Sequence, residues 1–169
     1  MKTLHLLRHA KAEATGQTRD HDRPLSTRGI EAARAMAQTL KDARFTVDRV
    51  YCSSSRRTRE TYELIKGSLG NAQVSFRDDL YLLDGYGLRD AIQELPGTLT
   101  SALFIGHDPG YHILANGLVK DDGDADLYAL RRKFPTGALC TITFNVEAWT
   151  DIKDGTGDLK AFIRPRDMD

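Results

Sequence analysis

The segment Leu4-His5-Leu6-Leu7-Arg8-His9 is a short apolar run that ends in two polar residues. Such a run is typical of a buried strand. Residues 47–52 and 101–105 form two further runs of this kind, and a stretch expected to be helical follows each of them. This alternation predicts an α/β fold of three layers (α/β/α), in which helices cover both faces of a mostly parallel central sheet.

The other expected elements complete this pattern. Helices are expected over residues 30–40, 53–69, 88–95 and about 110–118, and further strands over 74–76, 138–144 and 159–163. Ser26 or Thr27 would cap the first helix. Because about 100–200 residues usually make one domain, and the chain has 169 residues without an internal repeat, we expect a single domain over residues 1–169.

The composition argues against several classes of protein. The 24 basic and 24 acidic residues give a formal net charge of zero, which argues against nucleic-acid binding. No apolar run approaches the roughly 20 residues of a membrane span, and the apolar N-terminal stretch is too short for a signal peptide. Two cysteines, Cys52 and Cys140, are too few for a disulfide scaffold. We therefore expect a cytoplasmic protein that binds neither nucleic acid nor a membrane.

Basic and imidazole side chains follow three of the expected strands. These strand ends read Arg8-His9, Ser53-Ser54-Ser55-Arg56-Arg57 and Gly106-His107. Because the carboxyl ends of parallel strands meet at one edge of a sheet, we expect the three segments to lie together. Two histidines and two or three arginines in a small volume repel one another unless an anion lies between them. A phosphate fits this requirement, because its oxygens match the guanidinium fork.

The start of the second helix supports the same interpretation. Arg56, Arg57 and Arg59 lie in its first turn, where the helix dipole favours acidic residues. An anion bound at this helix N-terminus would compensate for the poor placement. A single arginine there normally faces solvent, and a single histidine after a strand is normally structural. One phosphate ligand explains all of these features together, whereas the structural interpretation needs a separate coincidence for each.

Four segments of the chain, in this order, resemble those of the histidine phosphatase superfamily. They are Leu6-Leu7-Arg8-His9-Ala10-Lys11-Ala12-Glu13, Arg23-Pro24-Leu25-Ser26-Thr27-Arg28-Gly29, Ser54-Ser55-Arg56-Arg57-Thr58-Arg59-Glu60-Thr61 and Gly106-His107-Asp108-Pro109-Gly110. Two late segments, residues 134–138 and 162–166, are similar to the branch of SixA-type phosphohistidine phosphatases. The superfamily usually has glycine after Arg-His; this branch allows the alanine found here, Ala10. The resemblance implies a phosphoglycerate mutase-like fold.

The resemblance also implies a covalent mechanism that requires no metal and no cofactor. His9 would attack phosphorus and become phosphohistidine, Arg8 and Arg57 would hold the phosphoryl oxygens, and His107 would donate a hydrogen bond to one of them. The attacking ring nitrogen of His9 must carry no proton, so the other should donate to a backbone carbonyl. Two neighbouring guanidiniums should lower the pKa of His9.

Arg57, rather than its neighbour Arg56, is assigned to the phosphoryl group. It precedes Thr61 by four residues, as in the Arg-x-x-x-Thr pattern of the family. Arg56 and Lys11 are expected to bind substrate from the rim of the pocket.

A proton donor is missing from its usual place. Many superfamily members that act on phosphate monoesters carry a glutamate shortly after the third strand, whereas residues 78–85 read Asp-Asp-Leu-Tyr-Leu-Leu-Asp-Gly. A phosphoramidate such as phosphohistidine needs a donor less, because its nitrogen can already be protonated. Asp84, Asp20 and Asp22 remain candidate donors, although each by itself is more simply interpreted as a solvated loop carboxylate.

Three functional hypotheses follow. The first is a phosphohistidine phosphatase whose partner is a phosphohistidine-bearing signalling protein, such as a histidine phosphotransfer domain. The second is a phosphatase of the same superfamily that acts on small phosphate monoesters. The third is a non-catalytic phosphate-binding regulatory module, against which the retained nucleophile His9 argues. Tyrosine-phosphatase chemistry fails on spacing, because the residue at the arginine position after Cys52 is Thr58.

Overall fold

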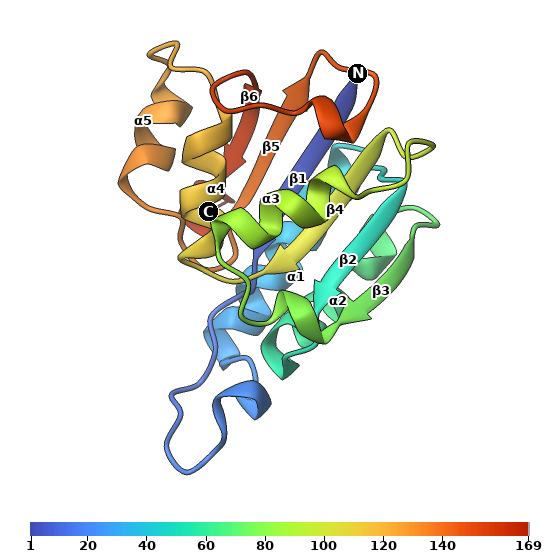
Figure 1. The fold of residues 1–169 in the computed structure, drawn as a ribbon. Coiled ribbons are helices and arrows are strands. Elements are labelled where there is room, and N and C mark those ends of the chain that lie inside the picture. The colour runs from blue at the N-terminus through green and yellow to red at the C-terminus, as the bar shows by residue number, and fades with distance from the viewer. Residues whose placement is uncertain (169) are drawn as a thin grey trace.

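The computed structural model describes residues 1–168, which form one six-stranded sheet with helices on both faces (Figure 1). The strands are β1 (Lys2–Arg8), β2 (Arg49–Ser53), β3 (Gln73–Arg77), β4 (Ser101–Gly106), β5 (Leu139–Phe144) and β6 (Asp158–Ile163). The α-helices are α1 (Thr27–Asp42), α2 (Arg56–Ile65), α3 (Gly85–Gln93), α4 (Gly110–Leu118) and α5 (Ala125–Arg132). The short 3₁₀ helices are η1 (Asp20–Asp22), η2 (Lys66–Ser68), η3 (Asp78–Leu80), η4 (Trp149–Asp151) and η5 (Pro165–Met168).

The sheet has the strand order β3-β2-β4-β1-β5-β6. Neighbours among β1 to β4 pair in parallel, whereas β5 runs antiparallel to β1 and to β6. This arrangement confirms the predicted mostly parallel sheet. Arg8 pairs with Gly106 and Cys52 with Ile105, so β1, β2 and β4 end at the same edge, below which the loop of residues 10–26 projects in Figure 1.

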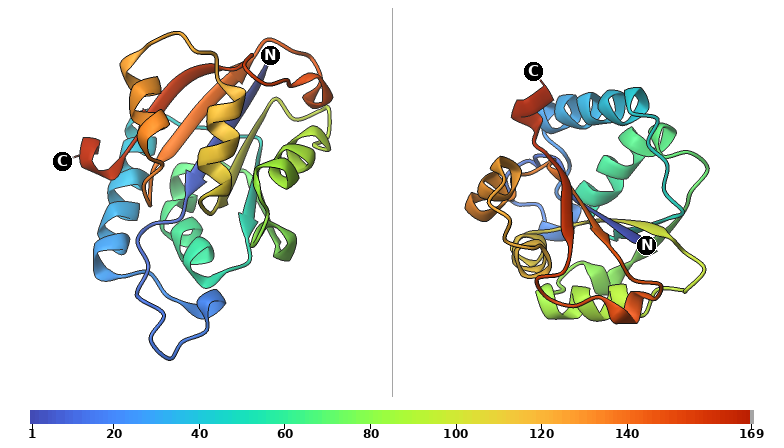
Figure 2. Two further views of the ribbon diagram at one scale, coloured as in Figure 1. Left: turned by 60° about the vertical axis from the view of Figure 1, so that its left-hand side comes forward. Right: turned by 90° about the horizontal axis from the view of Figure 1, so that it is seen from above.

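Two hydrophobic layers enclose the sheet. Helices α1 and α2 pack on one face through residues such as Met36 and Ile65, and α3, α4 and α5 pack on the other, as Figure 2 shows from above. Strand β1 contributes Leu4 and Leu6 to one layer and Leu7 to the other. Because both faces of β1 are covered, its sequence is apolar on both sides instead of alternating.

Capping side chains set the helix starts. The Ser26 side chain accepts a hydrogen bond from the Gly29 amide at 3.0 Å, which confirms Ser26 as the cap of α1. The predicted helix over residues 53–69 is too long at both ends. Strand β2 continues through Ser53, Ser55 caps α2, and the α-helix ends at Ile65.

Helix α5 has no counterpart among the expected elements. Asp124 caps it by accepting from the amides of Asp126 at 2.6 Å and Leu127 at 3.1 Å. The helix has 8 residues, and only Leu127 and Leu130 are buried. Two apolar positions do not establish a periodicity, which explains why the pattern gives no signal there. Across residues 1–168, no helix is long and apolar enough to cross a membrane.

Candidate active site

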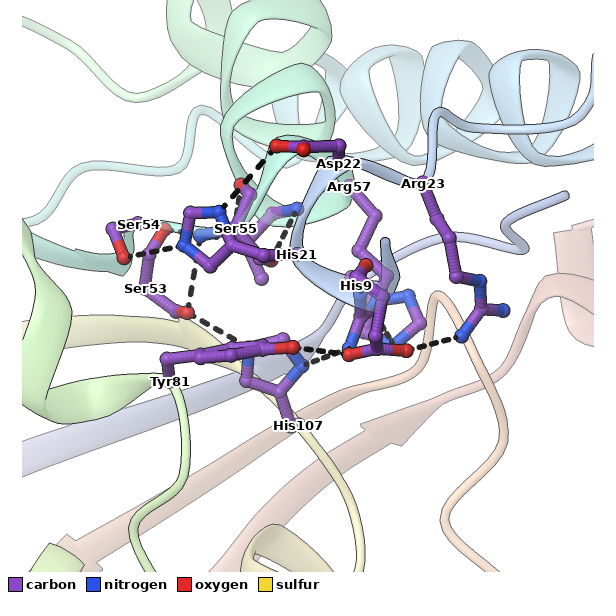
Figure 3. Close-up of polar contacts among 12 residues, drawn as sticks. His9, His21, Asp22, Arg23, Ser53, Ser54, Ser55, Arg57, Tyr81 and His107 are labelled. Atoms are coloured by element: carbon purple, nitrogen blue, oxygen red, sulfur yellow. Dashed lines mark hydrogen bonds and ion pairs between the residues drawn. The ribbon is translucent and has the colours of Figure 1, made fainter. Parts of the chain in front are cut away.

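Side chains from the ends of β1 and β4 and from the start of α2 meet at the carboxyl edge of the sheet (Figure 3). The ring centroids of His9 and His107 lie 5.4 Å apart, and the Arg57 guanidinium contacts both rings. These side chains line a cavity of about 310 Å³. The structure therefore brings together the histidines and the arginine that the three strand ends predicted. The cavity is lined by Arg8, His9, Lys11, Ala12, Arg23, Arg57, His107, Asp108 and Thr136.

The ring of His9 is held in one orientation. Its Nδ1 lies 2.7 Å from the Ala10 carbonyl oxygen. A carbonyl only accepts, so Nδ1 carries the proton and Nε2 keeps its lone pair. Burial, together with the positive charges of Arg57 and Arg8, lowers the pKa of His9 to about 4. His9 is therefore a neutral imidazole near pH 7.

Arg57 uses each of its guanidinium nitrogens. Its Nε lies 3.3 Å from His9 Nε2, and its Nη2 lies 3.4 Å from His107 Nδ1. Nη1 donates to the Asp20 carbonyl at 2.8 Å, and Nη2 also contacts the Asp20 carboxylate at 3.2 Å. The side chain is only 8% exposed. Its direction is fixed by these contacts, as electrostatic catalysis requires.

The contacts of Thr61 explain why it follows Arg57 by four residues. Its hydroxyl donates to the Arg57 carbonyl at 2.8 Å, one turn earlier in α2. The same oxygen accepts from the amide of Ala10 at 3.0 Å. Thr61 thereby ties the chain after His9 to the turn of α2 that carries Arg57.

His107 is held by a residue that the sequence analysis does not single out as functional. Its Nε2 lies 2.7 Å from Ser53 Oγ, and Ser53 is fully buried. Because Arg57 can only donate to His107 Nδ1, the proton of the neutral ring lies on Nε2, facing Ser53. Burial, followed by repulsion from His9 when that ring is also protonated and from Arg57, lowers the pKa of His107 to about 3. Without an anion, His107 thus presents an acceptor to the cavity, and a phosphoryl dianion beside Nδ1 would favour its protonated, donating form.

Arg8, the last residue of β1, lines the same cavity. Its Nη1 donates to the Phe134 carbonyl at 2.8 Å and lies 4.0 Å from the Asp108 carboxylate. Its Nε is buried and has no hydrogen-bond partner among the described residues. Burial lowers the pKa of Arg8, and the nearby Asp108 opposes this effect. A bound anion would give this Nε a negatively charged hydrogen-bond acceptor.

Asp20 binds the cations of the site, although its side chain remains 47% exposed. Its carboxylate accepts from Arg57, from Arg23 at 2.9 Å and from the Tyr81 hydroxyl. These bonds, led by that from Tyr81, hold the pKa of Asp20 well below its usual range. A carboxylate that stays ionised is poorly suited to donate a proton, so the structure argues against Asp20 as the proton donor.

The other four candidates lie in different settings. Asp84 caps α3 by accepting from the Gly87 amide at 2.8 Å, and Asp22 lies 3.8 Å from His21. Arg56 pairs with Glu60 at 2.9 Å. None of Asp84, Asp22 and Arg56 lines the cavity. The structure thus places Arg56 away from the rim where it is expected to bind substrate, and it agrees with the simpler interpretation of Asp84 and Asp22 as loop carboxylates outside the site. Lys11 does line the cavity, as expected.

Several residues of the site are absent from the predicted set. Arg23 and Thr136 line the cavity, and Tyr81 packs against His107 with ring centroids 5.5 Å apart. Arg23 belongs to one of the segments that carry the family resemblance, so the sequence could have indicated Arg23 as a residue of the site. Ser53 is the last residue of β2, so the convergence of the strand ends brings it to the site, whereas Tyr81 follows the short helix η3 and lies in a loop whose conformation no sequence spacing encodes. Among residues 1–168, no group of three or more His, Cys, Asp or Glu side chains is placed to hold a metal ion.

Comparison with known proteins identifies the class and then the family. The model of the histidine phosphatase superfamily (branch 1) matches residues 4–83, which contain His9, Arg57 and Tyr81. An uncharacterised protein of Mycobacterium tuberculosis is 30% identical over 162 residues, which cover 95% of this chain and 100% of the relative. The chain thus belongs to the histidine phosphatase superfamily, in its SixA-type branch, and is a phosphatase.

Solved structures support this assignment. A candidate phosphohistidine phosphatase SixA from Nakamurella multipartitia is 31% identical with a TM-score of 0.83, covering 97% of this chain and 96% of that one. A candidate phosphohistidine phosphatase SixA from Agrobacterium tumefaciens is 25% identical with a TM-score of 0.81, covering 97% of this chain and 98% of that one. The protein histidine phosphatase SixA complexed with tungstate is 24% identical and shares the fold, with a TM-score of 0.77 and 99% of both chains covered.

Proposed function

We propose that this phosphatase removes the phosphoryl group from phosphorylated histidine on a protein partner, through a covalent intermediate on His9 and without a metal ion. One observation carries the proposal. The Ala10 carbonyl fixes the proton of His9 on Nδ1, so that the unprotonated Nε2 lies beside the Arg57 guanidinium at 3.3 Å. This arrangement supplies a nucleophile and a fixed positive charge at the same place.

In the first displacement, the lone pair of His9 Nε2 forms a bond to phosphorus. The bond between phosphorus and the substrate nitrogen breaks, and the leaving imidazole takes that electron pair. Arg57 and Arg8 stabilise the charge on the equatorial phosphoryl oxygens. His107 donates to a phosphoryl oxygen in its protonated form, which the bound dianion favours. Two guanidiniums supply the charge that a metal ion would otherwise provide.

In the second displacement, water attacks the phosphorus of phosphorylated His9. The bond between phosphorus and Nε2 breaks, inorganic phosphate leaves, and His9 regains its lone pair. The hydrogen bond from Nδ1 to Ala10 supports both steps, because it keeps the same tautomer throughout.

The carboxylates around the cavity favour a phosphorus–nitrogen substrate. Asp108 is the one carboxylate among the described residues that line the cavity, and it faces Arg8. Asp20 is held ionised by its cationic partners and Tyr81. An alkoxide leaving group needs a strong donor, whereas a phosphorylated imidazole that is protonated on its other nitrogen leaves as a neutral ring. The site therefore suits phosphohistidine better than a sugar phosphate.

The substrate suggests a partner, and the cysteines suggest a compartment. A histidine phosphotransfer domain is a partner of the right chemistry, since it carries phosphohistidine on its surface. Cys52 and Cys140 are both buried free thiols, which suits the reducing cytoplasm.

Turnover of matched substrates tests the proposal. A phosphohistidine peptide and a panel of sugar phosphates are incubated with the protein, with and without EDTA, and phosphate release is measured. We expect the peptide to be preferred and EDTA to have no effect. Equal or faster turnover of the monoesters would contradict the proposed substrate. Binding of phosphate without turnover of any substrate, detected as thermal stabilisation, would favour a regulatory module.

A further inference from the structure

Two surface hollows beside the catalytic cavity are lined by cations and, among the described residues, by no acidic side chain. The first hollow, of about 250 Å³, is lined by Lys11, Arg28, Ala32, Pro135, Thr136, Arg164, Pro165 and Arg166. The second, of about 370 Å³, is lined by Ala125, Tyr128, Ala129, Arg132, Lys133, Pro135, Arg164 and Arg166. We call these two hollows together the basic groove.

The basic groove adjoins the catalytic cavity and shares wall residues with it. Lys11 and Thr136 line both the cavity and the first hollow. Arg164, Arg166 and Pro135 line both hollows. A path of cations therefore leads from the phosphoryl site across η5, which packs beside α1 in Figure 2, and on to the end of α5.

Most of the cations in the groove lack an acidic partner. In the part of the chain that the structure describes, Arg28, Arg166 and Lys133 form no ion pair, while Arg164 pairs with Asp167 at 3.0 Å. Asp126, on α5, is the other acid whose charge reaches Arg164. The whole chain has a formal net charge of zero. The unpaired cations of the groove are therefore a local excess of positive charge beside the site and do not reflect a generally basic surface.

Other hollows of the surface lack this one-sided charge. The hollow between η1 and α2 mixes Arg56 and Arg59 with Glu60, Glu63 and Asp22. The hollow between α3 and α4 contains Arg89 together with Asp154, which pair with each other. Excess positive charge thus distinguishes the groove next to the active site from these two hollows.

We infer that the basic groove docks an acidic segment of the protein that presents the phosphohistidine. This inference rests on the proposed function and names the chemistry of its partner. The groove extends through two hollows beyond the phosphoryl site, farther than one phosphoryl group needs. An acidic polypeptide surface complements it along this length. A nucleic acid fits less well, because Tyr128 is the single aromatic side chain lining the groove and single-stranded nucleic acids use several stacking rings.

The test uses two substrates that share the reacting group. One is a phosphohistidine peptide with glutamates on both sides, and the other is free phosphohistidine. The double variant Arg28→Glu/Arg166→Glu reverses two exposed groove cations outside the catalytic cavity. The control Arg34→Glu/Lys41→Glu makes the same change in charge at exposed positions of α1 that do not line the groove.

We expect the groove variant to raise KM for the acidic peptide about tenfold, with kcat unchanged. Turnover of free phosphohistidine should remain within about twofold of the original protein, and the control variant should behave like the original protein with both substrates. A KM that does not change in the groove variant, or that changes equally in both variants, would overturn the inference.

Direct binding separates this inference from the proposed catalysis. Fluorescence anisotropy with an unphosphorylated, fluorescein-labelled glutamate-rich peptide measures docking without turnover. We expect binding that weakens with added salt and is lost in the groove variant. If this binding occurs while phosphohistidine is not hydrolysed, the proposed function fails and the acidic docking surface stands. Tighter, groove-dependent binding of a labelled single-stranded RNA at the same salt concentration would contradict an acidic protein partner.

Discussion

The catalytic cavity and the basic groove lie side by side, yet their arginines are held very differently. In the cavity, Arg57 is 8% exposed and reaches His9, His107 and Asp20. In the groove, Arg28 and Arg166 are exposed and form no ion pair with another described residue. Transition-state stabilisation needs charges that are fixed before the reaction. Steering and docking an acidic partner need only the correct sign of charge.

Replacing Arg57 by lysine should cause the largest loss of activity, because Arg57 is the cavity cation that is held in a fixed position. An ammonium group cannot reach His9, His107 and a phosphoryl group from three separate nitrogens. We expect kcat/KM for a phosphohistidine peptide to fall about 100-fold or more. The control Arg28→Lys in the groove should remain within about twofold. Wild-type turnover by Arg57→Lys would show that another arginine clamps the phosphoryl group.

Replacing Ser53 by alanine tests whether the second histidine must also be fixed. Without the Ser53 hydroxyl, Nε2 of His107 loses its 2.7 Å partner and the ring can turn. We expect kcat to fall about tenfold or more with a smaller change in KM. The matched control is Ser54→Ala, whose hydroxyl contacts His21 at 3.0 Å outside the cavity. Equal losses in the two variants would contradict a special role of Ser53.

Asp20→Asn sharpens the distinction between a proton donor and an anion that competes with phosphate. The asparagine keeps an acceptor for Arg57 and removes the negative charge. We therefore expect inorganic phosphate to inhibit a few-fold more strongly, with kcat nearly unchanged. Steady-state inhibition measures both quantities. A 100-fold loss of kcat would instead identify Asp20 as the proton donor.

Stability at low pH distinguishes the buried site from the exposed groove. The pKa values of His5 and His9 are lowered to about 4 and that of His107 to about 3, from 6.5. Below pH 6.5 the unfolded chain binds more protons, so the free energy of unfolding should fall as the pH drops toward 4. Denaturation by urea across this range should show a shallower slope for His107→Gln and an unchanged slope for Arg28→Gln. An unchanged slope for His107→Gln would contradict a lowered pKa.

The sequence predicts which side chains meet at the site, because the carboxyl ends of the parallel strands β1, β2 and β4 lie at one edge of the sheet. Their order places Arg8-His9, the start of α2 and His107 at one edge, and each position follows from where an apolar run stops. The helix over residues 110–118 is predicted with the observed bounds, Gly110–Leu118. Register and topology thus encode the convergence of the nucleophile with its cations.

Contacts made through loops are not encoded in this way. The hydrogen bond between Tyr81 and Asp20 joins residues 61 positions apart, and both lie outside the strands and α-helices. The expectation that Arg56 contacts substrate follows from its position beside Arg57, but successive residues of a helix point about 100° apart. Arg56 therefore faces Glu60 at the surface while Arg57 enters the cavity.

The central claim is that Nε2 of His9 accepts the phosphoryl group. Rapid quenching in alkali after mixing with a phosphohistidine peptide, followed by mass spectrometry, tests it most directly. The predicted result is a transient phosphoryl group on the peptide that contains His9, lost on acid treatment and never formed by His9→Ala. Turnover at a near-normal rate by His9→Ala, or phosphorylation of another residue, would contradict the account.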